Sequence, residues 1–266
     1  MNANHIEAKF AALGARFKLQ PTFVGTDFAI DIQHDRAGEF FEFRRHERVR
    51  DAVNLTVLQT DSRDRHLLLL VRGDAEKKER FLCGHDEREW FVAAVPGTAS
   101  TVSQAKDALQ PRIVREALRS NNVPSRQRHW RKNDAFRRQG EWFFVPLSVW
   151  MRGPINEKFI LRNEPIRRGA GKPHMVEELY RTGGERVYVC SERPNGLSEV
   201  QYRRLLSEKP HAEKWDWRVM QRNAFVYARG AIRHPDHATI HLPDWHRVVM
   251  NTETDAPAMR SVAFLD

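Results

Sequence analysis

The chain has 266 residues, and its 44 Lys and Arg against 35 Asp and Glu give a formal net charge of +9. A mean hydropathy of −0.64 and a longest apolar run of only Leu67–Val71 exclude a membrane-spanning helix, which needs about 20 apolar residues. Seven Trp and fifteen Phe exclude a disordered chain, and two cysteines with no leader-like N-terminus predict a cytoplasmic protein with reduced thiols.

The first third of the chain has the pattern of a helix followed by an antiparallel sheet. Apolar residues recur at intervals of three and four over Ile6–Leu19, which predicts an amphipathic helix. Beyond it, three pairs of β-like runs each flank a polar turn, so three successive hairpins are expected within residues 27–95. The paired runs are Phe28–Ile32 with Glu39–Phe43, Asn54–Leu58 with His66–Val71, and Arg80–Cys83 with Trp90–Val95.

Two helices are expected after this sheet. Residues 101–109 form the first, and Pro111 suits the first turn of the second. At about 100° per residue, the arginines of the second helix fall on one side and its aliphatic residues on the other. The helix should therefore pack by its aliphatic side and expose Arg112, Arg115 and Arg119.

The second half of the chain is rich in β-like sequence. Thr182–Gly184 separates two apolar runs, Met175–Tyr180 and Glu185–Cys190, and predicts a hairpin. Ser198 is suited to cap a helix over Glu199–Glu208, with Val200, Leu205 and Leu206 facing inward. Further strands are expected at 141–146, 224–232, 238–242 and 245–250.

These patterns together predict an α+β protein: an antiparallel sheet with an N-terminal helix, a basic helical connector and a second β-rich unit. The expected boundaries are 1–108 for the helix and antiparallel β domain, 109–140 for the connector, and 141–266 for a β-rich domain with one helix.

Positive charge is concentrated in the middle of the chain. Residues 112–172 contain 15 basic and 5 acidic side chains, a net charge of +10, whereas the rest of the chain sums to −1. Arginine suits phosphate oxygens, and an interleaved tryptophan offers a face on which an unpaired base can stack. We therefore expect a nucleic-acid-binding surface, for DNA or RNA, formed by Arg112, Arg115, Arg119, Arg126, Arg128, Trp130, Arg131, Lys132, Arg137, Arg138, Arg167, Arg168 and Lys172.

Two other interpretations of this charge stay open. In the first, the basic segment binds an acidic protein partner. In the second, its charges are exposed to water and only keep the protein soluble. Its last part, 167–172, contains Gly169 and Gly171 and faintly suggests a phosphate-binding loop. The P-loop spacing is absent and Pro173 stands where a metal-binding hydroxyl is needed, which excludes nucleoside-triphosphate hydrolysis.

Four of the twelve histidines lie within thirteen residues near the C-terminus. In a strand over 238–242, His237 and His241 share a face but stand about 13 Å apart, too far to be neighbouring ligands of one ion. A divalent metal site would instead combine His234 with His237, or His241 with His246, plus a ligand from elsewhere. Acid–base catalysis by one histidine and hydrogen bonding within a hairpin are the alternatives.

The third predicted turn also contains reactive residue types. His85 follows Cys83 there, and it is a candidate catalytic group beside His237, His241 and His246 if the fold brings them together. Cys83 ends an apolar run, and we expect it, like Cys190, to be a buried and inert thiol.

Three blocks of sequence, 83–96, 137–146 and 233–248, resemble an uncharacterised family of bacterial proteins. The most distinctive block begins Arg233-His-Pro-Asp-His237 and ends Trp245-His-Arg-Val248. The family has no assigned activity, substrate or cofactor, so the resemblance implies no role for any residue.

The leading hypothesis is a cytoplasmic nucleic-acid-binding protein that grips phosphates with the central arginines and stacks bases on Trp130. The enzyme alternative is a metal-assisted phosphodiesterase, a nuclease, in which the C-terminal histidines hold a divalent ion or move a proton. A scaffold that binds an acidic protein is the third. Convergence of His85 with the C-terminal histidines around one cleft would favour the enzyme.

Overall fold

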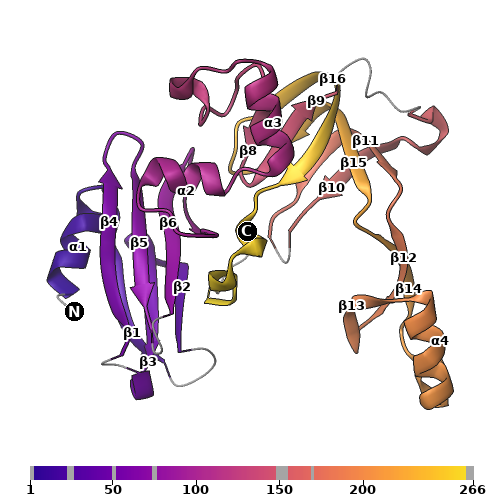
Figure 1. Ribbon diagram of the computed structural model, residues 1–266, viewed down its shortest axis with the longest axis horizontal. Coiled ribbons are helices and arrows are strands. Elements are labelled where there is room, and N and C mark those ends of the chain that lie inside the picture. The colour runs from indigo at the N-terminus through magenta and orange to yellow at the C-terminus, as the bar shows by residue number, and fades with distance from the viewer. Residues whose placement is uncertain are drawn as a thin grey trace.

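The computed structural model describes residues 3–22, 27–49, 52–73, 77–147, 155–168 and 171–261 (Figure 1). These ranges contain four α-helices and four mostly antiparallel sheets, which confirms the α+β class. In this part of the chain every helix is too short or too polar to span a bilayer.

The N-terminal part forms two sheets, with strand orders β1-β3-β2 and β4-β5-β6-β7. They share one core with helix α1, in which Phe10, Phe41 and Phe81 are fully buried. The elements are α1 (Ala3–Ala11), β1 (Phe17–Thr22), β2 (Phe28–Asp35), β3 (Gly38–His46), β4 (Asn54–Asp61), β5 (His66–Arg72), β6 (Lys78–Asp86) and β7 (Glu89–Ala94).

Strand β5 contributes to two cores at once. Leu67, Leu69 and Val71 belong to the core shared with α1, and Leu68 packs on the other side with helix α2 (Val102–Ala108). A strand that is covered on both faces is apolar along its whole length, because its side chains alternate between the faces.

All three predicted hairpins form, as β2 pairs with β3, β4 with β5, and β6 with β7. The third turn is tighter than expected. Gly84, His85 and Asp86 lie in β6, and the chain reverses at Glu87 and Arg88. These three residues are therefore held by the sheet.

The N-terminal helix is shorter than its apolar spacing predicted. It ends at Ala11, before Gly14, whose φ of +78° is left-handed. Phe17 and Leu19 lie in β1, parallel to β3, and the prediction that they continue the helix is wrong. Both residues still contact the same core.

The C-terminal half is built on a six-stranded sheet with the order β10-β11-β15-β16-β9-β8. Phe144, Leu179 and Ile232 belong to one of its two cores, and Phe143 packs in the other against α3. The elements are α3 (Arg112–Ser120), the 3-10 turn η3 (Ser125–Gln127), β8 (Arg137–Gln139), β9 (Trp142–Pro146), η5 (Glu157–Phe159), β10 (Leu161–Ile166), β11 (His174–Thr182), β15 (Phe225–Arg233) and β16 (Ile240–Met250).

The hairpin expected around Thr182–Gly184 does not form. Strand β11 pairs with β10 and β15, whereas the next strand, β12 (Glu185–Cys190), belongs to a separate sheet. Gly184 has a φ of +88°, and a Cβ there would lie 2.7 Å from the Arg222 carbonyl oxygen. The glycines thus allow a close backbone crossing between two sheets.

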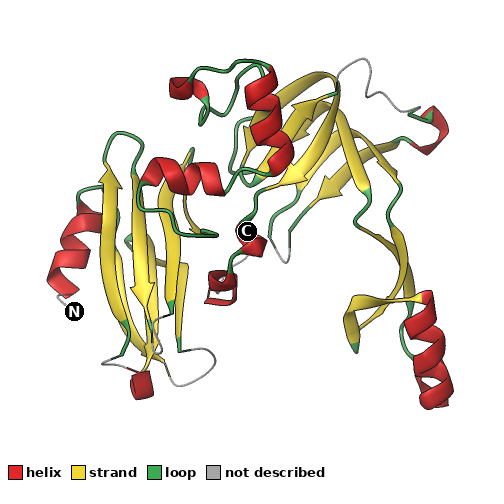
Figure 2. Cartoon of the chain, in the orientation of Figure 1, coloured by secondary structure: helices red, strands yellow, loops and turns green. Residues whose placement is uncertain are grey.

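The separate sheet, ordered β13-β12-β14, forms an arm with helix α4 that projects from the six-stranded sheet (Figures 1 and 2). Ser198 caps α4 in a capping box with Gln201, as its position predicted. Leu205 is buried, but Val200 is 77% exposed, so its predicted inward position is wrong. The elements are β13 (Arg193–Ser198), α4 (Glu199–Glu208), η6 (Pro210–Lys214) and β14 (Arg218–Arg222).

The last described residues return to the N-terminal part. Turns η7 (Glu253–Asp255) and η8 (Pro257–Ser261) contact β6 and β7, and Ala256 and Ala258 are buried in the core around α1. The first and the last described elements thus share one core. The boundaries 1–108, 109–140 and 141–266 stay predictions.

Candidate metal centre

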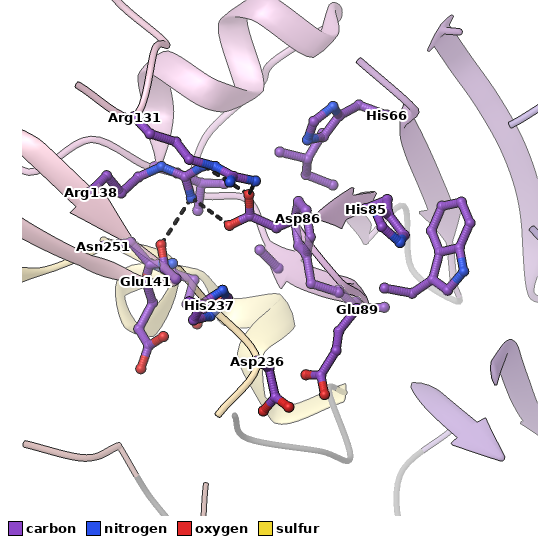
Figure 3. A pocket seen from close by; sticks show the side chains of 18 of the residues that line it. His66, His85, Asp86, Glu89, Arg131, Arg138, Glu141, Asp236, His237 and Asn251 are labelled. Carbon is purple, nitrogen blue, oxygen red and sulfur yellow. Dashed lines mark hydrogen bonds and ion pairs between the residues drawn. The ribbon is translucent and has the colours of Figure 1, made fainter. Parts of the chain in front are cut away.

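A cavity of about 1030 Å³ lies where the β6–β7 hairpin, the connector, β11 and the loop after β15 meet (Figure 3). Seven carboxylates and four Lys or Arg side chains line it, so its formal charge favours a cation over an anion. Seven of the twelve histidines also line it: His34, His66, His85, His129, His174, His234 and His237.

Three of these histidines form one cluster. His174 begins β11, and His234 and His237 follow β15; one ring nitrogen from each lies within 4.8 Å of the other two. The ring centroids of His174 and His234 are 4.3 Å apart, and those of His234 and His237 are 4.7 Å apart. Tetrahedral zinc requires nitrogens about 3.4 Å apart, so the three rings, which are stacked with interplanar angles of 25°, 19° and 27°, would turn about their soft χ2 torsions to bind one ion.

All three imidazoles are held in the neutral form that binds metals. Burial lowers the pKa of His174 to about 3, with a further contribution from the other two rings. Burial also lowers the pKa of His234 and of His237. A metal ion therefore does not have to displace a proton from these neutral rings to bind at neutral pH.

Gln139 determines which nitrogen of His174 is free. Its amide nitrogen donates to the Ala238 carbonyl at 2.7 Å, so its oxygen must face the ring. That oxygen lies 2.9 Å from His174 Nδ1, which therefore carries the proton and leaves the lone pair on Nε2. An acceptor that binds the N–H of a ligand histidine in this way orients the ring and raises its basicity.

His237 has a carboxylate nearby, but no hydrogen bond joins the two side chains, and the buried Nδ1 of His237 has no hydrogen-bond partner among the described residues. Glu87 Oε2 lies 3.6 Å from the buried Nδ1 of His237 and accepts the Ala238 backbone N–H at 2.6 Å. The other oxygen of Glu87 pairs with Arg131 at 2.5 Å. The β6–β7 turn thus reaches across the cavity to support the loop that contains two of the three histidines.

His234 is anchored by the backbone. Its Nδ1 accepts a hydrogen bond from the Asp236 N–H at 3.2 Å, and the other ring nitrogen donates a hydrogen bond to the Lys172 carbonyl oxygen. Nδ1 is consequently the nitrogen with the lone pair, and a metal ion must compete with the Asp236 amide for it.

Gly140 leaves space beside the three rings. A Cβ at this position would lie 3.1 Å from His237 Nε2 and 3.5 Å from His174 Nε2, and φ is +56°. The next residue, Glu141, places Oε2 3.8 Å from His174 Nε2. A carboxylate that can accept a proton therefore lies near the buried Nε2 of His174.

Much of the predicted basic surface is paired with acids from other parts of the chain. Arg131 and Arg138 both bind Asp86; burial raises the pKa of this carboxyl, but the two guanidinium groups lower it by more, so its pKa lies below the usual value. Lys172 pairs with Asp236 at 2.7 Å and Glu89 at 3.3 Å. Arg168 is buried against Glu253. Gly169 and Ala170 of the glycine-rich loop lie outside the described residues.

The remaining predicted cations stay at the surface. Arg112 pairs with Glu116 one turn along α3. Within the described ranges no acid pairs with the exposed side chains of Arg115, Arg119, Arg126, Arg128, Lys132 and Arg167, nor with half-buried Arg137. Trp130, which is 53% exposed, lies beside them and lines the cavity.

The predicted histidines divide into two groups. His85 lines the cavity and packs edge-on against Trp90, and His234 and His237 come together as their spacing suggested. His241 is exposed on β16, and His246 lies in a different cavity. Cys83 and Cys190 are buried, and burial raises the pKa of Cys83 far above its usual value.

Sequence reasoning missed four residues of this site: His174, Gln139, Glu141 and Glu87. Each lies at or next to the end of a strand and belongs to no recognisable motif. The three sequence blocks 83–96, 137–146 and 233–248 all contribute residues to the cavity, and the first two contain Glu87, Gln139 and Glu141. No protein-family model, curated protein or solved structure matches the chain.

Proposed function

We propose that the protein is a metal-dependent phosphodiesterase that acts on nucleic acid, with His174, His234 and His237 as ligands of one divalent ion such as Zn²⁺. The observation that carries this proposal is the meeting of three neutral imidazoles in an acid-lined cavity. Three histidines with an open fourth position are a typical ligand set of catalytic zinc.

The residues around the ligands suit hydrolysis. A divalent ion in such a site polarises a phosphoryl oxygen and lowers the pKa of a bound water. Glu141, near His174 Nε2, is placed to take the proton of the attacking water. Gln139 holds the His174 ring in orientation, and Glu87 holds the backbone of the loop that contains His237.

The surface beside the cavity supports a nucleic-acid substrate. Arg115, Arg119, Arg126 and Arg128 are exposed without acid partners in the described part of the chain, so they are free to bind phosphates. Trp130, which follows Arg126 and Arg128 in the chain, is exposed and also lines the cavity. A strand held by the arginines would thus have one phosphodiester near the histidines, while the acid-rich cavity retains the ion.

The experiment is metal analysis followed by hydrolysis assays. Chelator-treated protein should bind about one Zn²⁺ or Co²⁺ per chain, and the reloaded protein should cleave a labelled single-stranded oligonucleotide. His174→Ala and His234→Ala should each lower metal affinity at least tenfold and abolish cleavage. His241→Ala, an exposed histidine of β16, is the matched control and should leave both unchanged.

Two outcomes would overturn the proposal. One is the absence of stoichiometric metal binding by the wild-type chain. The other is cleavage that survives in His234→Ala at the wild-type rate. Salt-sensitive binding of the oligonucleotide without any cleavage would also reject the enzyme and leave a nucleic-acid-binding protein.

A further inference from the structure

A second cavity, of about 530 Å³, adjoins the first. Trp130 and Phe136 line both cavities, so the segment between them forms part of the wall that separates the two. The end of β9, Leu147 after it and the Pro243–His246 part of β16 also line the second cavity. It lies outside the metal centre and contains none of the three clustered histidines.

Aromatic surface is available at this cavity. The indole of Trp130 is 53% exposed, which is unusual for a tryptophan. Trp245 lines the cavity from β16, and the Arg229 guanidinium lies 4.8 Å from the centre of its ring. An exposed indole at a cavity mouth is suited to stack against a base, and each such stack contributes about 1–3 kcal/mol.

His246 provides a hydrogen-bond acceptor at the same place. Its Nδ1 lies 2.7 Å from the Asp244 carbonyl oxygen, so Nδ1 carries the proton and Nε2 has the lone pair. Burial and the nearby Arg137 lower its pKa, which keeps the ring neutral. A neutral imidazole acceptor pairs with the exocyclic amino group of a base.

Cations for a phosphate are also present. Arg137 and Lys132 both line the cavity, and no carboxylate pairs with either one among the residues that the structure describes. The cavity also contains Asp134 and Asp244, and Asp244 is occupied in accepting the Trp245 backbone N–H at 2.8 Å. The two cations can therefore meet a phosphate at the rim.

We propose that this second cavity binds one nucleoside monophosphate unit of a single-stranded nucleic acid, with the base on Trp130, its amino group toward His246, and its phosphate at Arg137 and Lys132. The assignment rests on the proposed function, because it makes this cavity the substrate subsite next to the metal centre. Since Trp130 lines both cavities, the neighbouring phosphodiester would point toward the histidine cluster.

The test is a titration of metal-free, full-length protein with the four nucleoside monophosphates, with nucleosides and with inorganic phosphate, followed by tryptophan fluorescence. We expect saturable quenching by nucleoside monophosphates, strongest for those whose base has an exocyclic amino group. Trp130→Ala should weaken binding at least tenfold, and Arg137→Gln with Lys132→Gln should do the same. Arg203→Gln, on helix α4 of the projecting arm, removes an equal charge outside both cavities and should have no effect.

The outcomes separate this inference from the proposed function. Nucleotide binding that survives in His234→Ala supports the subsite even if that variant and the wild type show no hydrolysis. Hydrolysis whose KM is unchanged in Trp130→Ala refutes the subsite and leaves the metal centre standing. Binding of inorganic phosphate as tight as that of nucleotides, or no nucleotide binding at millimolar concentration, also overturns the subsite.

Discussion

At the scale of single residues, Glu87 combines an unfavourable backbone conformation with several contacts of its carboxylate at the cavity. It occupies the β6–β7 turn with a φ of +55°, a conformation that costs an ordinary residue about 1–2 kcal/mol and that favours glycine or asparagine. Its carboxylate reaches His237, the Ala238 amide and Arg131. A strained turn residue with three such contacts indicates that the carboxylate is needed at this place.

Gly140→Ala should weaken metal binding. The added Cβ would crowd His237 Nε2 at 3.1 Å, so we expect at least a tenfold rise in the dissociation constant for Zn²⁺ or Co²⁺. The left-handed φ also costs about 1 kcal/mol of stability. Gly97→Ala is the control, because Gly97 has a φ of +77° and open space around it. Calorimetric titration would contradict the prediction if both variants bound metal like the wild type.

The buried histidines should make unfolding of the metal-free protein pH-dependent. Burial lowers the pKa of His174 to about 3 and that of His66 to about 4, so the unfolded chain takes up protons at higher pH than the folded chain. Their contribution to the free energy of unfolding is therefore fully present above pH 6.5, and it is lost as the pH falls from there toward the pKa values of the folded protein. Each can contribute a slope of up to about 1.4 kcal/mol per pH unit.

Urea unfolding at several pH values between 7.5 and 4 measures this slope. In His174→Gln, the free energy of unfolding should change less with pH than in the wild type. The carboxylates are the same in both proteins, so their contributions cancel in this comparison. Equal slopes would mean that His174 is not held neutral in the folded state.

At the scale of elements, helix α3 follows its sequence pattern closely. Val114 and Leu118 are buried against Phe143, and the opposite side exposes Arg115 and Arg119. Helix α4 begins after Ser198 for an equally local reason, the reciprocal hydrogen bonds with Gln201. Both predictions succeeded because amphipathic spacing and capping act within a few residues.

The exposed side of α3 should contribute to nucleic-acid binding through charge. In Arg115→Gln with Arg119→Gln, the slope of log K against log salt for an oligonucleotide should decrease in magnitude by about 2. Arg203→Gln with Arg204→Gln on α4 removes the same charge from the projecting arm, where both arginines pair with glutamates. This control should keep the wild-type slope, and an equal loss in both variants would argue against a localised surface.

At the scale of the whole molecule, the charge distribution differs from that along the chain. Residues 112–172, the window with a net charge of +10, contain four cations that each pair with a carboxylate from outside the window: Arg131, Arg138, Arg168 and Lys172. These pairs connect the N-terminal and C-terminal parts around the cavity. The window therefore contributes both an exposed arginine surface and the ion pairs that hold the cavity together.

The buried pair of Arg168 and Glu253 joins the chain after β10 to the C-terminal turn η7. Glu253→Gln leaves a buried guanidinium without its countercharge and should lower the free energy of unfolding by about 3–5 kcal/mol. Asp27→Asn, which removes an exposed pair with Arg48, should change it by less than about 1 kcal/mol. Chemical denaturation of both variants measures the difference, and similar small losses would contradict the structural role of the buried pair.

The sequence by itself determined the α+β class, three N-terminal hairpins and the positions of α2, α3 and α4, because alternation, helical spacing and caps are local properties. It also indicated that His234 and His237 can share a site across a short turn. Even locally it failed at Thr182–Gly184, where sheet pairing with distant strands outweighed the hairpin pattern.

Only the tertiary structure decided what surrounds those two histidines. His174, Gln139 and Glu87 come from three different strands and turns, and their contacts depend on how the sheets pack rather than on spacing along the chain. The same packing separated His241 and His246 from the cluster and neutralised part of the basic segment. A sequence shows which residues are charged and which can bind a metal. Which residues contact them depends on how distant parts of the chain pack together, and no local pattern contains that information.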